Sequence, residues 1–338
     1  MKTFKKITAA LSILALTLSL TACGGGGGAD SSSAPAASAD QGDKQYKIGI
    51  IQLVENGAFD DMKKGFKAEM EKEYGAGNVE FVEKSAQGDA SNMNTIAQEM
   101  AGGSYDLVAT IATPASQAYV NQKSDTPQVF IAVSQPVKAG LLASMEKPDK
   151  NATGTQNPIP VEGIFNLAKA LKPEIETVGI LYSANEVNSN ATAKDAKAQL
   201  EKMGLKAVER TVSNSSEVKQ TADSMAAEVD AIFVPNDSLI QDAIALVVDA
   251  TTAHKIPILG SSKVMVDAGA LLSVAIDDVD TGAQSARLAI EVLNGKAVAD
   301  VPAIAIAGDM VDINMATAEK LGITVPQDVQ DKAHSLVK

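Results

Sequence analysis

The sequence predicts an α/β fold with two doubly wound, Rossmann-like lobes, and three observations support this prediction. First, the 338 residues are enough for about two domains, and 45% of them are hydrophobic, which is typical of globular proteins. Second, apolar runs typical of buried parallel strands alternate with segments of helical periodicity. Third, the body of the chain contains an internal repeat. Two parallel sheets, each covered by helices on both faces, follow from these observations.

The N-terminal residues are predicted to lie outside these lobes. Three lysines within residues 1–6 precede an apolar run at residues 7–22. This run is shorter than the roughly 20 residues that a membrane-spanning helix needs, so residues 1–22 are predicted to be an export signal. Residues 23–45 are rich in Gly, Ser and Ala, which predicts a flexible tether.

The last residues of the export signal, Leu20, Thr21 and Ala22, together with Cys23, resemble the lipobox of bacterial lipoproteins. The resemblance implies that the thiol of Cys23 receives a diacylglyceryl group and becomes the new N-terminus. An uncleaved anchor or a buried cysteine is the alternative. We therefore expect an exported protein that is lipid-anchored to the outer face of the cell membrane.

The first copy of the repeat contains four predicted strands and three predicted helices. The strands are expected at residues 46–54, 79–85, 107–112 and 128–133, and the helices near residues 58–73, 91–101 and 114–123. The strands are apolar along most of their length, and the helices carry apolar residues at helical spacing.

The second copy repeats this order at an offset of 130 residues. Residues 48–50 and 67–72 (IGI and KAEMEK) match residues 178–180 and 197–202 (VGI and KAQLEK). A general likeness between any two α/β segments is the alternative to duplication. The predicted strands lie at residues 177–182, 206–212, 231–234 and 258–260, and the helices at residues 188–203, 216–227 and 238–254.

A strand at residues 271–276, a helix at residues 280–293 and a strand at residues 310–314 are expected to belong to neither copy. We expect the chain to cross between the lobes near residues 155–160, 277–280 and 305–310, and three crossings form a hinge. The predicted lobes are residues 46–156 with 281–306, and residues 157–280 with 307–338. The carboxyl ends of the strands would then line a shared cleft.

The composition excludes several classes of function. The 29 basic residues are outnumbered by 42 acidic ones, which argues against nucleic-acid binding. One cysteine and two histidines cannot form an internal disulfide or a Cys/His zinc site. Neither His254 nor His334 has a plausible nucleophile as partner, so no enzyme activity, cofactor or metal is expected. The chain is expected to be a monomer.

Three segments resemble one family. Residues 182–189 (YSANEVNS) resemble its Tyr-Asn-x-x-Glu-x-Asn-Ser, residues 234–238 (VPNDS) its Val-Pro-Thr-Asp-Asn, and residues 112–115 (ATPA) also fit. From about Tyr46 to its end the chain resembles the type I periplasmic binding proteins of ABC importers, closest to the family that captures tryptophan, tyrosine or phenylalanine. The resemblance implies closure over a ligand and delivery to a permease and its ATPase. Residues 55–60 (ENGAFD) depart from a commoner His-Pro-Ala-Leu-Asp, which leaves the ligand side chain open.

Polar residues at the strand ends are the candidates for binding the head group of an amino acid. Thr113 and Ser116, or Asn188 and Ser189 in the facing lobe, are expected to bind its carboxylate, because helix N-termini attract anions. Asp237 is the first choice for the ammonium group and Asp277 the second. Helix capping is the alternative for Thr113 and Asp237, and a solvated helix start is the alternative for Asp277.

Other residues could contact the ligand side chain or line the cleft. Phe59 and Tyr182 follow the first strands of the two copies, and packing within the lobe is the alternative for both. The cleft-facing loops and the first crossing add Glu55, Ser134, Gln135 and Asn157.

The expected function is a solute-binding lipoprotein of an ABC importer for an amino acid, with an aromatic side chain favoured. A sensory lipoprotein that uses the same closure is the first alternative. Capture of a sugar or nucleoside is the second, and the low aromatic content of 4% argues against it.

Overall fold

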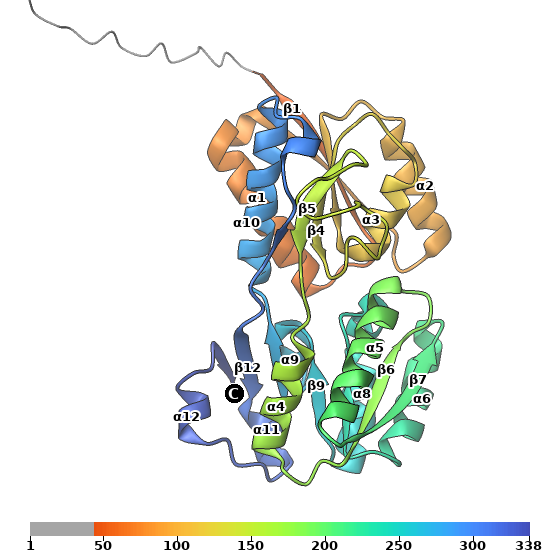
Figure 1. Ribbon diagram of the computed structural model, residues 1–338, viewed down its shortest axis with the longest axis vertical. Coiled ribbons are helices and arrows are strands. Elements are labelled where there is room, and N and C mark those ends of the chain that lie inside the picture. The colour runs from red at the N-terminus through yellow and green to blue at the C-terminus, as the bar shows by residue number, and fades with distance from the viewer. Residues whose placement is uncertain (1–43) are drawn as a thin grey trace, which may run out of the picture. The chain divides into compact units, whose positions relative to one another are not determined.

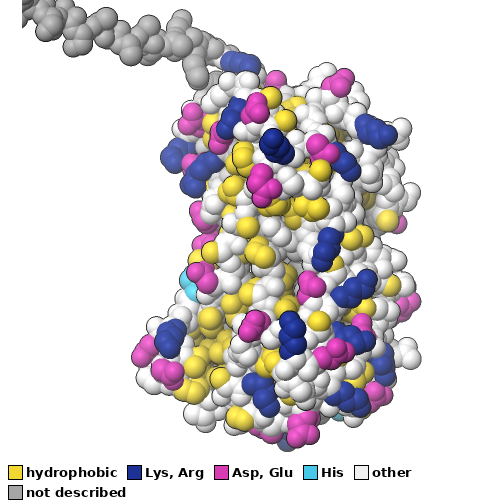
Figure 2. All heavy atoms as spheres, in the orientation of Figure 1, with side chains coloured by type: hydrophobic (Ala, Val, Ile, Leu, Met, Phe, Trp, Pro, Cys, Tyr) yellow, Lys and Arg dark blue, Asp and Glu magenta, His cyan; other side chains and the backbone are white. Residues whose placement is uncertain are grey.

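The computed structural model describes residues 44–338. The export signal, Cys23 and nearly all of the tether lie outside the described residues. Within residues 44–338, no helix is both long enough and apolar enough to cross a membrane. On the face in Figure 2, acidic and basic side chains are interspersed.

The first sheet has six strands, all parallel to their neighbours, in the order β11-β5-β4-β3-β1-β2 (Figure 1). Its central strands are buried along their whole length and, apart from Thr110 and Gln128, are apolar, as expected for a parallel sheet. The strands are β1 (Tyr46–Gln52), β2 (Val79–Ser85), β3 (Leu107–Ile111), β4 (Gln128–Val133), β5 (Ala152–Gln156) and β11 (Ile304–Ala305).

The second sheet has seven strands in the order β13-β12-β10-β9-β8-β6-β7. Only the pair β10 and β12 is antiparallel. The strands are β6 (Thr177–Ser183), β7 (Lys206–Val212), β8 (Ala231–Phe233), β9 (Ile258–Gly260), β10 (Leu272–Ala275), β12 (Met310–Asn314) and β13 (Ser335–Val337).

Helices cover both sheets. Those of the first lobe are α1 (Gly57–Tyr74), α2 (Ala90–Ala101), α3 (Ala112–Val120) and α10 (Asp278–Leu293), with the short helices η1 (Ala76–Asn78) and η3 (Val298–Asp300). Those of the second lobe are α4 (Val161–Leu171), α5 (Val187–Lys202), α6 (Val218–Ala226), α7 (Ser238–Asp242), α8 (Ile244–His254), α9 (Lys263–Asp267), α11 (Met315–Lys320) and α12 (Gln327–Gln330), with η2 (Ser215–Glu217). Several begin at capping side chains, for example Asn56 before α1 and Asp89 before α2.

The predicted fold class is confirmed, with corrections to individual elements. The helix expected at residues 238–254 is two helices, α7 and α8, which break at Ala243. The strand at residues 271–276 was expected to belong to neither copy, and this was wrong. The strand β10 occupies the same place in the order β10-β9-β8-β6-β7 as β5 does in β5-β4-β3-β1-β2, so each copy has five equivalent strands.

Each copy gives its next helix to the other lobe. After β5 the chain enters α4, which packs against α5, β9 and β10 of the second lobe. After β10 it enters α10, which packs against α1, β4 and β5 of the first lobe. The chain returns to the second lobe between β11 and β12. Three segments therefore connect the lobes, and two of them lead directly from a strand end into a helix.

The contact between α1 and α10 is unusually close. A Cβ atom on Gly65 would overlap the carbonyl oxygen of Val279, and one on Gly282 would overlap the carbonyl oxygen of Met62. Both overlaps are with backbone, which cannot rotate away as a side chain can. Glycine at these two positions therefore fixes where α10 begins relative to α1.

Candidate functional site

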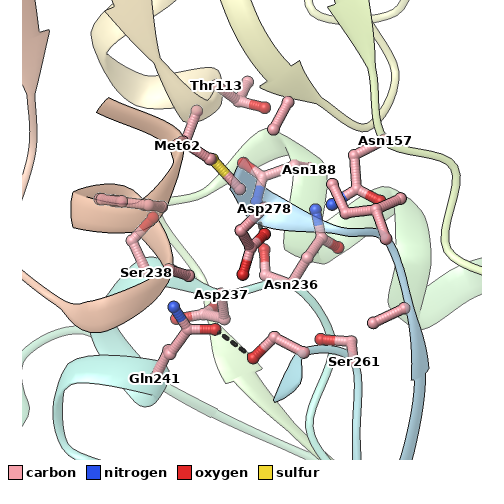
Figure 3. Close-up of a pocket in the computed structure, with 17 residues that line it drawn as sticks. Met62, Thr113, Asn157, Asn188, Asn236, Asp237, Ser238, Gln241, Ser261 and Asp278 are labelled. Carbon is pink, nitrogen blue, oxygen red and sulfur yellow. Dashed lines mark hydrogen bonds between the residues drawn. The ribbon is translucent and has the colours of Figure 1, made fainter. Parts of the chain in front are cut away.

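A pocket lies between the two lobes, beside the segments that connect them (Figure 3). It contains about 550 Å³ of space that no protein atom fills, and this space includes open solvent. The strand ends of both sheets contribute to its walls, as expected for facing parallel sheets.

The two walls of the pocket differ in chemistry. The first lobe contributes apolar atoms, with Ala58, Phe59 and Met62 from α1 and Ala132 from the end of β4. The second lobe contributes polar side chains, which are Asn188, Asn236, Asp237, Ser238, Gln241, Ser261 and Ser262. The connecting segments add Asn157 after β5, and Ile276 and Asp278 after β10. The pocket can therefore hold a molecule with an apolar part and a polar part.

The N-terminus of α3 opens onto the pocket. Both Ala112 and Thr113 line it, and among the described residues no side chain caps this helix. Ala112 has a φ of 66° and Ala132 a φ of 58°, in the left-handed region that alanine rarely adopts. Such backbone strain is often found at functional sites. The free N–H groups of the first turn and the helix dipole make this end suitable for an anion.

Asp278 is the carboxylate that lies most centrally in the pocket in Figure 3. Among the described residues no group donates a hydrogen bond to its side chain. Burial, followed by the nearby charges of Asp61, Asp277 and Asp312, raises the pKa of Asp278 to about 8. A cationic group of a ligand would supply the partner that this side chain lacks.

Two carboxylates that are more deeply buried than the half-buried Asp278, those of Glu186 and Asp237, cap α7. The carboxylate of Asp237 accepts the N–H of Ile240 at 2.9 Å and that of Ser183 at 2.6 Å. Glu186 accepts the N–H of Ser238 at 3.1 Å and that of Leu239 at 3.2 Å. Burial, and then the charge of Asp237, raises the pKa of Glu186 to about 8, and burial raises the pKa of Asp237 as well. Both side chains hold the helix that lines the pocket.

Five of the residues predicted from the sequence line the pocket, namely Phe59, Thr113, Asn157, Asn188 and Asp237. Asp237 also caps α7, and helix capping was the alternative role expected for it.

The other predicted residues lie outside the pocket. Ser116 is a buried residue of α3, where its hydroxyl donates to the carbonyl of Ala112, and Ser189 is buried within the second lobe. The hydroxyl of Tyr182 lies 3.2 Å from Glu209. Asp277 caps α10 by accepting the N–H of Asp280.

The last three lie in loops of the first lobe. Glu55 is exposed. Ser134 and Gln135 line a separate cavity with Lys138, and the amide of Gln135 donates to Asp195 of the second lobe at 3.2 Å. This hydrogen bond joins the two lobes.

Four polar residues line the pocket without having been predicted from the sequence as site residues. They are Asp278, Gln241, Ser261 and Ser262. A strand was predicted at residues 258–260, so the rule that ligands bind at strand ends could have found the two serines. Asp278 directly follows Asp277, which was predicted as a site residue. Only the backbone geometry shows which of the two side chains faces the pocket. Among the described residues, no group of three or more His, Cys, Asp or Glu side chains could hold a metal ion.

The raised pKa values predict how stability depends on pH. The carboxyl groups of Glu186 and Asp278 titrate near 4 in an unfolded chain and near 8 in the folded protein, so folding favours their protonated forms. Their contribution is complete below pH 4 and is lost as the pH rises towards 8. The free energy of unfolding without ligand should fall between pH 5.5 and 8, by at most about 1.4 kcal/mol per pH unit for each group. Urea denaturation at constant ionic strength measures this, and a stability that increases over this range would contradict it.

Comparison with known proteins relates this architecture to one family. The family model described as ABC transporter substrate binding protein matches residues 47–337. The chain is 37% identical over 280 residues to a tyrosine-binding protein of Clostridioides difficile, covering 82% of this chain and 81% of that protein.

Two solved structures are similar over 87% of this chain. A structure from Streptococcus pneumonia in complex with L-Trp is 34% identical, is covered completely, and has a TM-score of 0.85. The ligand-free, open structure of a substrate-binding protein with adhesive properties from Clostridium difficile is 33% identical, is covered to 99%, and has a TM-score of 0.66. At nearly equal identity and coverage, the backbone therefore superposes better on the complex than on the open form.

Proposed function

The chain belongs to the ABC transporter substrate-binding protein family, and on that premise we propose that it captures an aromatic amino acid and delivers it to a membrane permease and its ATPase. The observation that carries the proposal is the carboxylate of Asp278, which has no hydrogen-bond donor among the described residues and lies in a pocket with one apolar wall and an open helix N-terminus. The tyrosine-binding relative and the L-Trp complex support an aromatic ligand.

Asp278 is proposed to bind the ammonium group of the ligand. An ammonium needs a negative charge and hydrogen-bond acceptors, and burial makes a charge-assisted hydrogen bond stronger. The side-chain oxygen of Asn188 is a second acceptor, because it is buried and has no partner among the described residues. This assignment moves the ammonium role from Asp237, whose two oxygens already accept backbone N–H groups.

The carboxylate of the ligand is proposed to bind at the N-terminus of α3. The N–H groups of its first turn and the hydroxyl of Thr113 would donate hydrogen bonds to it. The aromatic ring would then pack against Phe59, Met62 and Ile276, which form the apolar side of the pocket.

Closure of the lobes over the ligand is proposed as the signal that the permease recognises. A ligand that contacts both walls at once stabilises the closed form, because only that form makes both sets of contacts. The hydrogen bond between Gln135 and Asp195 would form on closure and separate on opening. The better superposition on the L-Trp complex than on the open structure supports this view.

Calorimetry on the mature protein tests the proposed function. Tryptophan, tyrosine and phenylalanine should bind, whereas leucine, lysine and glutamate should bind at least tenfold more weakly. Two analogues separate the head-group contacts, because tyramine lacks the carboxylate and 3-(4-hydroxyphenyl)propionate lacks the ammonium group. Both should bind at least tenfold more weakly than tyrosine. Preference for a sugar or an aliphatic amino acid would contradict the proposal.

We further propose that the protein is exported and held at the outer face of the membrane by lipid on Cys23. Replacing Cys23 with Ala should release the protein into the soluble fraction, because the thiol is the only attachment point for the diacylglyceryl group. Fractionation of cells that express each form measures this, with Ser31→Ala as the control. A Cys23→Ala variant that stays in the membrane fraction would contradict lipid anchoring.

A further inference from the structure

The floor of the pocket contains polar groups that the binding of an amino-acid head group does not use. The side chains of Gln241 and Ser261 lie at the opposite end of the pocket from Thr113 and Met62 (Figure 3). Both are contributed by the second lobe, by α7 and by the loop that follows β9.

Ser261 has a hydroxyl that is buried without a hydrogen-bond partner among the described residues. The residue is 3% exposed, and its Oγ atom neither donates nor accepts a hydrogen bond there. Leaving such a group unpaired is unfavourable, because it loses its hydrogen bonds to water without replacing them, so buried hydroxyls are normally paired. Because this one lines the pocket, a ligand can supply the missing partner.

Gln241 is a second polar side chain at this end of the pocket. Its Oε1 atom accepts a hydrogen bond from the hydroxyl of Ser262 at 2.6 Å. That contact fixes the orientation of the amide and leaves its nitrogen available to donate. The floor of the pocket therefore offers one hydroxyl, which can donate or accept, and one amide N–H donor.

We propose that Ser261 and Gln241 form a subsite for a hydrogen-bonding group at the far end of an aromatic side chain, and that this group is best a phenol hydroxyl. The proposal rests on the proposed function, because a head group held by Asp278 and α3 directs the ring towards this floor. A phenol donates one hydrogen bond and accepts another, so it can pair with both residues. An indole N–H only donates and leaves the Gln241 amide unpaired, and a phenyl ring leaves both residues unpaired.

The affinity order that follows is tyrosine, then tryptophan, then phenylalanine. Sites that hydrogen-bond a substrate hydroxyl reject the analogue without it strongly, because their own buried polar groups are then unpaired. Tyrosine should therefore bind at least tenfold more tightly than phenylalanine.

Calorimetry with tyrosine and phenylalanine on the mature protein and on Ser261→Ala tests the subsite. The substitution should reduce the ratio of the two affinities to less than threefold, through weaker tyrosine binding and unchanged phenylalanine binding. Its melting temperature without ligand should not fall, since the substitution removes an unpaired hydroxyl. Ser134→Ala is the matched control, because Ser134 is also 3% exposed with an unpaired hydroxyl but lines a different cavity.

The outcomes separate this inference from the proposed function. If tyrosine and phenylalanine bind equally well to the unaltered protein, or if Ser261→Ala leaves their ratio unchanged, the subsite is refuted and the proposed function stands. If no aromatic amino acid binds, both are refuted. If Ser134→Ala changes the ratio as much as Ser261→Ala does, the effect is not local and the subsite is refuted.

Discussion

Replacing Asp278 with Asn is expected to weaken the binding of an aromatic amino acid by about 30-fold or more, without unfolding the protein. Removing one partner of a buried, charge-assisted pair costs about 2 to 5 kcal/mol, and 2 kcal/mol corresponds to about 30-fold in affinity. Asn has nearly the same size as Asp, and the variant has no ionisable carboxyl group beside Asp61, Asp277 and Asp312. Its stability without ligand should therefore be equal or higher, which denaturation measures alongside the calorimetry.

Asp277→Asn is the matched control for this experiment. Asp277 precedes Asp278 and accepts the N–H of Asp280, a cap that Asn can also make, so its affinity should stay within about threefold of the unaltered protein. Asp237→Asn tests the other candidate for the ammonium group. A large loss of affinity in Asp237→Asn with none in Asp278→Asn would return that role to Asp237.

The same assignment predicts a pH dependence of affinity. The pKa of Asp278 without ligand is about 8, and a bound ammonium group lowers it, so binding below pH 8 releases a proton. Affinity should fall as the pH decreases from 8 to 6, by at most about tenfold per pH unit. In Asp278→Asn this dependence should be absent, and an equally steep dependence there would assign it to another group.

Replacing Gly282 with Ala is expected to be among the most destabilising substitutions in the first lobe. The added methyl group would overlap the backbone carbonyl of Met62, so α10 has to move away from α1. Overpacking against rigid backbone costs about 3 kcal/mol or more, which lowers the melting temperature by roughly 6 °C or more in a protein of this size. Because Asp278 lies at the first turn of α10, ligand affinity should fall together with the melting temperature.

Gly77→Ala controls for the general effect of replacing a glycine. A Cβ atom on Gly77 would contact nothing within 4 Å, so its melting temperature should stay within about 2 °C of the unaltered protein. Equal melting temperatures for Gly282→Ala and the unaltered protein would show that α1 and α10 separate at little cost.

The strands that the sequence predicts most clearly consist mainly of apolar residues, such as β3 and β4, in which Thr110 and Gln128 are the polar residues. The strand β5 was missed because its sequence, Ala152–Gln156, contains two threonines and a glycine. Both threonines are buried, and their hydroxyls are paired with distant residues, Thr153 with the carbonyl of Val301 and Thr155 with Ser285. Contacts between residues more than 100 positions apart stabilise this strand, and local patterns cannot predict them.

The candidate site was predictable for its loops and for five of its residues, but not for Asp278 or Ser261. The two aspartates at positions 277 and 278 are chemically identical in the sequence. The extended backbone of Asp277 turns its side chain towards the helix N-terminus as a cap, while Asp278, one residue further, lines the pocket. Likewise, the hydroxyl of Ser261 lacks a hydrogen-bond partner because of how distant segments pack around it. The sequence near Ser261 does not predict this.

Each lobe contains one helix from the other repeat, because α4 follows the first repeat but packs in the second lobe, and α10 follows the second repeat but packs in the first lobe. Cutting the gene between the repeats would leave each product without one helix of its own lobe and with a surplus helix suited to the other. Two such fragments would complete each other only when present together, as the subunits of a dimer do.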